Sequence, residues 1–496
     1  VELSSRGALL TRALLRDYSG EDTESPLVLI SAELLSTGAL ALELDRSGTP
    51  LDEVVWEVAG ESSEEQSVAF RAPLGGDRAV EKRIRLARDD YLLEVEVIFT
   101  GDWPVARSPQ YRLSTPDRIR YERTSRGGAN RQVTGYAGPD GRFAATERRK
   151  IELIPEGERL DAQPALWSGL ESNYFAFVMR PVVDTSWSPG LWNVVVRGTS
   201  DPQAKELAGD FNEQGIQGLP YSVGFRREAR GGETQRFEVF LGPKDRQVLS
   251  RHAEVGYGEL IDYGRLGFLV RIFLWLLSFF EGIFRSYGIA IICLTVIVKA
   301  ALHPINKKNQ AVMQQQQKKM AKIQPEMQKV KERYKNDSMK ANREIQKLMK
   351  EQGVNPAQMF GGCLMIFLQL PVWIGLINTF SLALELRQTP FLYISDLTQP
   401  DHLFELPFSL PLLGSWFNLL PVVYVILTLV NQRMMPKSDN PQMQQQQKMM
   451  TFMMVAFGFI FYGFSSGLLL YFLTSAGLGI IEQKIIRAEL RGKGIR

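Results

Sequence analysis

The sequence predicts a mixed fold class: an all-β sandwich extracytoplasmic domain, followed by an α-helical transmembrane bundle of five visible spans. Charge divides the chain into two parts. Residues 1–250 hold 31 Lys and Arg against 39 Asp and Glu, whereas residues 251–496 hold 27 against 16. The first part alternates apolar and polar residues with a period of two, and the second contains long stretches without charge. The two parts therefore belong in different environments.

Residues 1–250 are predicted to form one periplasmic β-sandwich domain. Every second residue from Leu93 to Phe99 is apolar, and Glu94 and Glu96 stand between them, as in a strand with one buried face. Further runs with this pattern are 54–58, 174–183, 192–198, 221–227 and 237–241, and turn clusters lie at 75–77, 127–128 and 139–141. No strong helical pattern competes with them. We expect an extramembrane scaffold, because no phosphate loop or carboxylate pair is visible.

Charge-free stretches predict the spans of the second half, since a spanning helix needs about 20 apolar residues. Residues 449–481 form a run of 33 positions without charge. A single helix of that length would measure about 50 Å, well beyond a hydrocarbon core of about 30 Å. We therefore divide it at Ser465–Gly467 into a hairpin. The predicted transmembrane helices are 286–304, 357–384, 412–433, 449–464 and 468–486.

The distribution of Lys and Arg predicts the topology. Residues 305–356 hold 13 Lys and Arg and 5 acids, so we place them in the cytoplasm. Counting from there puts the loop 385–411 outside, the loop 434–448 inside, the basic tail 487–496 inside, and the acidic β domain outside. Because the sequence opens at Val1 with no signal, we expect an N-terminal signal or anchor helix upstream of it.

Two further segments are predicted to be amphipathic or charged helices. Residues 251–285 contain apolar residues between charges, and their longest uncharged run has 9 residues, so we expect an interfacial amphipathic helix and a linker. A linker helix buried under the β domain is the alternative. Residues 305–356 are expected to form a cytoplasmic helical hairpin with Met-rich contacts, kinked or divided at Pro325. A plain solvated hairpin is the alternative there.

Most enzyme classes find little support in the composition. The chain has two cysteines, in apolar runs, and three histidines far apart in sequence, so we expect no metal, no cofactor and no catalytic residues. Residues 463–467 match G-x-S-x-G, but that motif needs a strand, a turn, a helix and a histidine base. An intramembrane serine protease acting through Ser465 is therefore the least favoured function.

Lys299 is the most informative residue of the predicted spans. A lysine within a span is costly and usually faces protein or water, although snorkelling toward Lys307 and Lys308 is an alternative. Further polar or aromatic residues lie at Thr295, Gln369, Trp373, Tyr471, Thr474 and Ser475. Each could make an ordinary interhelical hydrogen bond. Together they predict a hydrophilic recess in the bundle, which would suit an insertase or, as the alternative, a small-solute or lipid transporter.

Several motifs together resemble the YidC/Oxa/Alb family of membrane protein insertases, in its Gram-negative form with a large periplasmic domain. They are Tyr287–Gly288, Thr295–Lys299, His303–Pro304, Val354–Pro356, Gly361–Cys363, Gln369–Pro371, Glu385–Gln388 and Ser466–Phe472. In the first half, Tyr174–Ala176 and Leu241–Lys244 resemble the periplasmic domain of that form. The likeness is dense over 240–490 and thinner before it.

The resemblance implies an inner-membrane insertase and chaperone that is not an enzyme. It implies a groove open to cytoplasm and lipid, in which a positive charge attracts hydrophilic parts of the incoming chain. Lys299 stands where the family usually has Arg, Phe472 where it commonly has Tyr, and Thr295 and Trp373 match important positions. The implied partners are nascent membrane proteins, the ribosome, the Sec translocon and the phospholipid bilayer, with no specific nucleic acid recognition.

Overall fold

The structure is a computed structural model, and the chain divides into two compact units, of which the first ends at Asp262 and the second begins at Tyr263. The expected turn at 127–128, the motif at 354–356 and part of the loop 434–448 lie outside the described residues. The described residues are 1–20, 25–31, 38–44, 51–88, 90–103, 109–120, 130–150, 164–182, 193–198, 221–335, 337–351, 361–410, 414–433 and 441–492.

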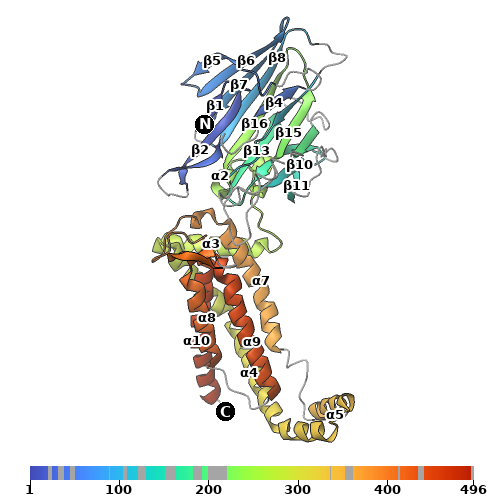
Figure 1. Cartoon of the computed structure of the whole chain (residues 1–496), viewed down its shortest axis with the longest axis vertical. Helices are drawn as coiled ribbons and strands as arrows, with labels where there is room; N and C mark the ends of the chain where they lie inside the picture. Colours follow the sequence, from blue (N-terminus) through green and yellow to red (C-terminus); the bar gives the residue numbers. More distant parts are fainter. Residues whose placement is uncertain are drawn as a thin grey trace. The chain divides into compact units, whose positions relative to one another are not determined.

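The first unit is rich in β-strands (Figure 1), which confirms the expected β-rich N-terminal domain. Its strands are β1 Glu2–Ser4, β2 Leu9–Ser19, β3 Pro26–Ser31, β4 Ala41–Leu44, β5 Glu57–Ser62, β6 Ser67–Gly75, β7 Arg78–Leu86, β8 Leu92–Thr100, β9 Gln110–Ser114, β10 Arg131–Ala137, β11 Phe143–Lys150, β12 Ala165–Glu171, β13 Phe175–Val182, β14 Asn193–Gly198, β15 Tyr221–Glu228 and β16 Thr234–Pro243. They form antiparallel sheets in the orders β11-β10-β12-β13-β16-β8-β7-β6-β5, β14-β15-β9-β4 and β1-β2-β3.

Strand β8 shows how the alternating pattern places residues in the large sheet. Leu93, Val95 and Val97 point into the core and are at most 2% exposed. The glutamates between them face outward and pair with arginines of β7, where Arg83 lies 3.4 Å from Glu96. Because side chains alternate across a strand, one face is buried and the other carries charges.

The predicted strand at 54–58 is displaced in the structure. Strand β5 begins only at Glu57 and is an end strand of the nine-stranded sheet, with β6 as its one hydrogen-bonded neighbour in that sheet. Trp56 is buried and its Nε1 donates to the Leu51 carbonyl at 2.9 Å, whereas Val55 and Val58 are exposed. Buried Trp56 and exposed Val55 agree with the predicted alternation, which is wrong at Val58, because an edge strand has little protein to cover its side chains.

The segment after β16 folds onto the first unit. It contains α2 Arg246–Ser250, capped by the Asp245 side chain, and the short helices η4 Ala253–Val255 and η5 Tyr257–Leu260. Gly256 adopts a φ of 79°, and a Cβ there would lie 2.2 Å from the Phe143 ring. Only glycine combines this backbone conformation with such a close approach.

The second unit is helical. Its elements are α3 Gly267–Phe284, α4 Tyr287–Arg333, α5 Ser338–Glu351, α7 Gly361–Leu382, η6 Leu384–Leu386, β17 Phe404–Leu410, β18 Gly414–Phe417, α8 Leu419–Arg433, α9 Pro441–Ile460, η7 Phe461–Gly463 and α10 Ser466–Gly492. Three described segments are long and apolar enough to cross a membrane: Gly267–Phe284, Tyr287–Asn309 and Ser466–Ile485. Shorter apolar helices are Leu419–Arg433 and Thr451–Gly463.

Helix α3 has one buried and one exposed apolar face. Its buried residues are Val270, Phe273, Leu274 and Leu277, and its exposed stripe is Phe268, Ile272, Trp275, Phe279 and Ile283. Within the helical unit, α3 lies crosswise to α8, α9 and α10 (Figure 1). By length and hydropathy the whole helix is a candidate span, although its longest uncharged run has 9 residues; its interfacial placement stays a prediction. Arg271 interrupts the apolar run, but its guanidinium lies 5.0 Å from the Tyr263 ring.

Helix α4 runs without a break from Tyr287 to Arg333. Pro304 and Pro325 lie inside this helix. Of the two expected effects of Pro325, a kink or a division, the division is therefore wrong. Its last third packs against α5 through four buried residues, Ile323, Met327, Ile345 and Met349. The charged hairpin thus has a small apolar core of its own, half of it methionine.

The connection between α9 and α10 is held by hydrogen bonds to the loop between α7 and α8. Helix α9 and its extension η7 end at Gly463, and α10 begins at Ser466. The Ser466 amide and hydroxyl both donate to the Gln399 carbonyl, at 2.7 and 2.6 Å. The Gly467 amide donates to the Leu397 carbonyl at 2.8 Å. These bonds satisfy amides at the start of α10 that have no partner within the helix.

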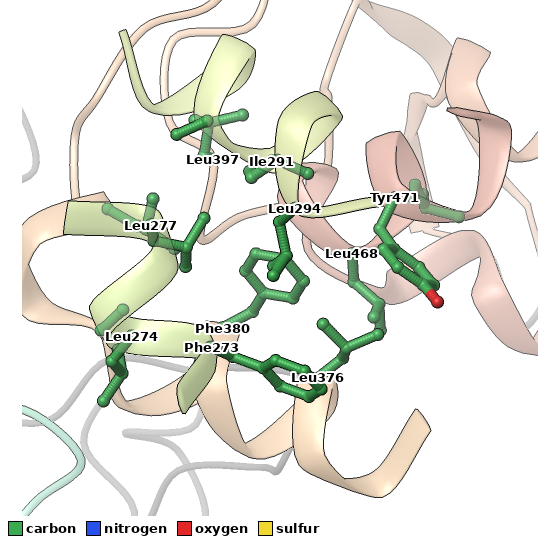
Figure 2. Close-up of a cluster of buried hydrophobic side chains, with 14 of the residues drawn as sticks. Phe273, Leu274, Leu277, Ile291, Leu294, Leu376, Phe380, Leu397, Leu468 and Tyr471 are labelled. Atoms are coloured by element: carbon green, nitrogen blue, oxygen red, sulfur yellow. The ribbon is translucent and has the colours of Figure 1, made fainter. Parts of the chain in front are cut away.

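The core of the second unit draws side chains from α3, α4, α7 and α10 (Figure 2). Leu294 and Leu376 are fully buried at its centre, and Phe380 and Leu468 pack beside them. In Figure 2 the Tyr471 ring lies at the edge of this cluster, and its hydroxyl points away from the aliphatic side chains. The Tyr471 hydroxyl therefore marks one edge of the apolar core.

Candidate functional site

Aromatic residues of α7, α10 and η7 meet in the helical unit. The ring of Phe461 stacks on Phe472 with centroids 5.0 Å apart, and Trp373 packs edge-on against Phe461 at 6.2 Å. Two residues expected at the site, Trp373 and Phe472, therefore contact the same ring. The indole Nε1 of Trp373 is buried without a hydrogen-bond partner in the described part of the chain.

Gln369 and Tyr471 also come together. The Gln369 side-chain amide donates to the Tyr471 hydroxyl at 3.4 Å and so connects α7 with α10. Tyr471 is buried, and its ring packs edge-on against Phe472. Of the three polar residues expected on this face of α10, Tyr471 therefore has a hydrogen bond to α7. Thr474 and Ser475 are half-buried, and the structure gives their side chains no hydrogen bond among the described residues.

Thr295 lies in the interior and uses its hydroxyl locally. It is fully buried, and Oγ1 donates to the Ile291 carbonyl of its own helix at 2.7 Å. Thr379 on α7 makes the same kind of bond to the Gly375 carbonyl at 2.8 Å. Both hydroxyls donate to the i−4 carbonyl of their own helix, which is neither an interhelical bond nor a contact with the expected recess.

Lys299 is half-buried and lies where α4 meets α8 and α10. A Cβ built on Gly479 would lie 3.9 Å from Lys299 Nζ and 3.7 Å from Asn431 Nδ2. The missing side chain at position 479 therefore leaves space next to both polar groups. Oδ1 of Asn431 and Oε1 of Gln483 are buried without a hydrogen-bond partner in the described residues. Buried polar atoms of this kind need water or an incoming polar group.

Sequence reasoning missed an acidic residue beside this lysine. Nδ1 of His303 lies 2.9 Å from Oε1 of Glu482, and the Asn306 amide donates to the same oxygen at 3.3 Å. Lys299 lies one helical turn before His303 on the same face of α4. We call Lys299, His303, Asn306, Asn431, Gly479 and Glu482 the polar cluster. Its sequence signal was available, because Glu482 directly follows the charge-free run that ends at residue 481.

The histidines have partners other than a serine. His252 contacts Asp90, His303 contacts Glu482, and His402 stacks on Trp416 with centroids 5.2 Å apart. No ring nitrogen of a described histidine hydrogen-bonds Ser465. Among the described residues there is also no group of three or more His, Cys, Asp or Glu that could hold a metal ion.

Comparisons with known proteins agree with this architecture. The family model "YidC periplasmic domain" matches residues 1–276, and "60Kd inner membrane protein" matches residues 279–493. A β-rich unit followed by apolar helices thus defines a multi-pass inner-membrane protein with a periplasmic domain. The chain belongs to the YidC family of membrane protein insertases.

Named relatives cover the chain to different extents. The "Membrane protein insertase YidC" of Geobacter metallireducens is 30% identical over 98% of this chain and 83% of its own length. That of Syntrophobacter fumaroxidans is 30% identical over 85% and 71%. The Haemophilus influenzae protein is 36% identical over 55% of this chain, and the match spans about half, 47%, of that relative.

Solved structures resemble only about half of the chain. A galactose mutarotase-like protein from Lactobacillus casei aligns with 48% of it at 11% identity and a TM-score of 0.28. A putative aldose 1-epimerase from Escherichia coli aligns with 49% at 9% identity and a TM-score of 0.22. Likenesses this weak carry no statement about activity.

Proposed function

We propose that this protein receives nascent membrane proteins in a hydrophilic, positively charged recess and releases their apolar segments into lipid, alone or with the Sec translocon. The observation that carries this proposal is the position of Lys299, half-buried beside the space at Gly479 and near the orphaned Oδ1 of Asn431. A cation in that position attracts carboxylates and polar backbone groups of a client chain.

The energetics favour a recess over an energy-consuming machine. Moving an unsatisfied backbone group through hydrocarbon costs several kcal/mol. A recess with polar walls shortens the dry path for the hydrophilic part of the client. Burial of its apolar segment in lipid, at roughly 25 cal/mol per Å², then supplies the driving force.

The membrane arrangement belongs to this proposal. The five spans are 286–304, 357–384, 412–433, 449–464 and 468–486. Helix α3 lies in the outer interface, because its exposed stripe of Phe268, Trp275 and Phe279 suits the boundary between headgroups and acyl chains. The basic hairpin and the basic tail then face the cytoplasm. The first unit is a β-sandwich in the periplasm.

The partners follow from the same proposal. Clients are nascent membrane proteins, and the phospholipid bilayer receives their apolar segments. The basic tail and the hairpin of α4 and α5 lie on the side where a ribosome delivers the chain, and the Sec translocon hands over clients within the membrane. No cofactor, metal or catalytic residue takes part.

Site-specific photocrosslinking to a stalled nascent membrane protein tests the recess. A photoreactive phenylalanine at Trp373 or Phe472 should crosslink to the client, because both rings border the proposed path. The matched control is the same group at Phe452 on α9, where the ring is 75% exposed. Yields at Phe452 equal to those at Trp373 and Phe472 would show that the client contacts the outside of the bundle instead.

A further inference from the structure

The polar cluster contains opposite charges on two helices. Lys299, His303 and Asn306 follow one another at intervals of four and three residues, so they lie on one face of α4. Glu482 lies on α10, one turn beyond Gly479. Both oxygens of its carboxylate are within 3.5 Å of the Asn306 amide, and Oε1 also contacts His303.

These contacts hold the Glu482 carboxylate in place between α4 and α10. His303 and Asn306 satisfy the carboxylate by hydrogen bonds, and no Lys or Arg of the described residues lies within 4.0 Å of it. The side chain of Glu482 is only 13% exposed. A charge in so little-exposed a position acts on its neighbours with weak screening, and Lys299 lies one helical turn before His303, the contact partner of Glu482.

We propose that Glu482 is a specificity-determining residue, a resident counter-charge that opposes Lys299 and limits how strongly the recess retains acidic client segments. This inference rests on the proposed function. Lys299 and Glu482 place opposite charges in the recess, so an acidic segment is attracted by Lys299 and repelled by Glu482. A neutral segment is attracted by Lys299 and repelled by Glu482 much more weakly than an acidic segment. Glu482 therefore sets the difference between acidic and neutral clients and permits release of the acidic ones.

His303 and Asn306 are the positioning residues of this counter-charge. They connect Glu482 to α4, four and seven residues after Lys299, and so fix the separation between the two charges. A Cβ at position 479 would meet Lys299 Nζ at the ordinary contact distance of 3.9 Å, and we expect a client carboxylate to approach the ammonium over this glycine while Glu482 stays in place. The recess can therefore bind a carboxylate of the client while the Glu482 carboxylate keeps its hydrogen bonds to His303 and Asn306.

The test compares Glu482→Gln with wild type, using two stalled clients that differ only in an acidic or a neutral tail. Glutamine keeps an oxygen for the Asn306 amide and removes the charge. Crosslinking from position 472 to the acidic-tail client should rise by about 3- to 30-fold, as expected for one weakly screened charge at short range. Crosslinking to the neutral-tail client should stay within about twofold of wild type.

The double variant His303→Phe with Asn306→Ala is the matched control. It frees the carboxylate from α4 but keeps it in the protein, so it should raise the ratio of acidic to neutral crosslinking less than Glu482→Gln does. An unchanged ratio in Glu482→Gln, or an equal change for both clients, would show that Glu482 only joins the helices and would overturn the inference. Wild type that crosslinks neither client would instead overturn the proposed function.

Discussion

The Gln369 side-chain amide donates a hydrogen bond to the Tyr471 hydroxyl at 3.4 Å, and this contact connects α7 with α10. Both residues are polar positions on otherwise apolar spans. Their pairing places the polar edge of α10 next to α7, at the boundary of the apolar core.

We predict that Gln369→Leu destabilises the helical unit more than Tyr471→Phe. The first change leaves a buried hydroxyl without its partner, at a cost of about 1–3 kcal/mol, whereas the second leaves a half-buried amide, at a cost of about 0.5–1 kcal/mol. Thermal unfolding in nanodiscs measures both, and the double variant gives the coupling. Additive effects of the two changes would show that the contact contributes nothing.

Gly479 offers a second prediction, because its missing side chain leaves space beside Lys299 and Asn431. Gly479→Leu should fill that space and lower crosslinking of acidic clients by about tenfold, while the protein still folds. Gly477→Leu is the matched control, since a Cβ there has no atom within 4 Å. Equal losses in the two variants would indicate a general defect of α10, unrelated to the polar cluster.

We predict that the free energy of unfolding of the first unit depends on pH because of Lys82. Its Nζ is fully buried and donates to the carbonyls of Ala8, at 2.7 Å, and of Leu40. Burial lowers the pKa of Lys82 from 10.5 to about 7. Between these two values the unfolded chain binds more protons than the folded one. The free energy of unfolding should therefore rise with pH across this window, by at most about 1.4 kcal/mol per pH unit, and be lowest below pH 7.

Urea titrations of the full chain, read by pulse proteolysis of the first unit, measure this effect from pH 6.5 to 9. Lys82→Met removes the buried cation and should flatten the dependence. Arg83→Gln, on the exposed face of the same strand, should leave it unchanged. A slope in Lys82→Met equal to that of wild type would assign the pH dependence to other groups.

The hairpin of α4 and α5 should be separable from the membrane core. Deletion of residues 310–351 should impair insertion without unfolding the helical unit, because the hairpin packs on its own core of Ile323, Met327, Ile345 and Met349. The deletion begins after Asn309 so that Asn306 keeps its contact with Glu482. Expression and thermal stability provide the control. Loss of folded protein would show that the hairpin is structural.

Much of the architecture could be predicted from local patterns. The alternation from Leu93 to Phe99 specifies one buried face, and the structure buries its apolar residues. The charge in the apolar segment of α4 marked Lys299, because lysine is rare there for a physical reason. The strand prediction is confirmed because a pattern within about ten residues reflects the environment of the side chains, and the role of Lys299 stays a prediction.

Features that depend on distant partners could not be predicted in this way. Glu482 contacts His303, which is 179 positions away in the sequence, and no local pattern predicts that pairing. The exposure of Val58 depends on β5 being an end strand, which is a property of the whole sheet. The cation–π contact of Arg271 with the Tyr263 ring, at 5.0 Å, likewise joins two residues that no periodic pattern connects.

The central claim is that the charge at position 299 attracts acidic or polar client segments. Its most direct measurement is insertion of a matched pair of clients, one with an acidic and one with a neutral extracytoplasmic tail, into proteoliposomes containing wild type, Lys299→Arg or Lys299→Ala. Arginine preserves charge and reach, so Lys299→Arg should insert both clients normally. Lys299→Ala should lose about 1–3 kcal/mol of attraction, or about 5- to 150-fold, for the acidic tail and little for the neutral one. An equal loss for both tails in Lys299→Ala would contradict attraction by charge.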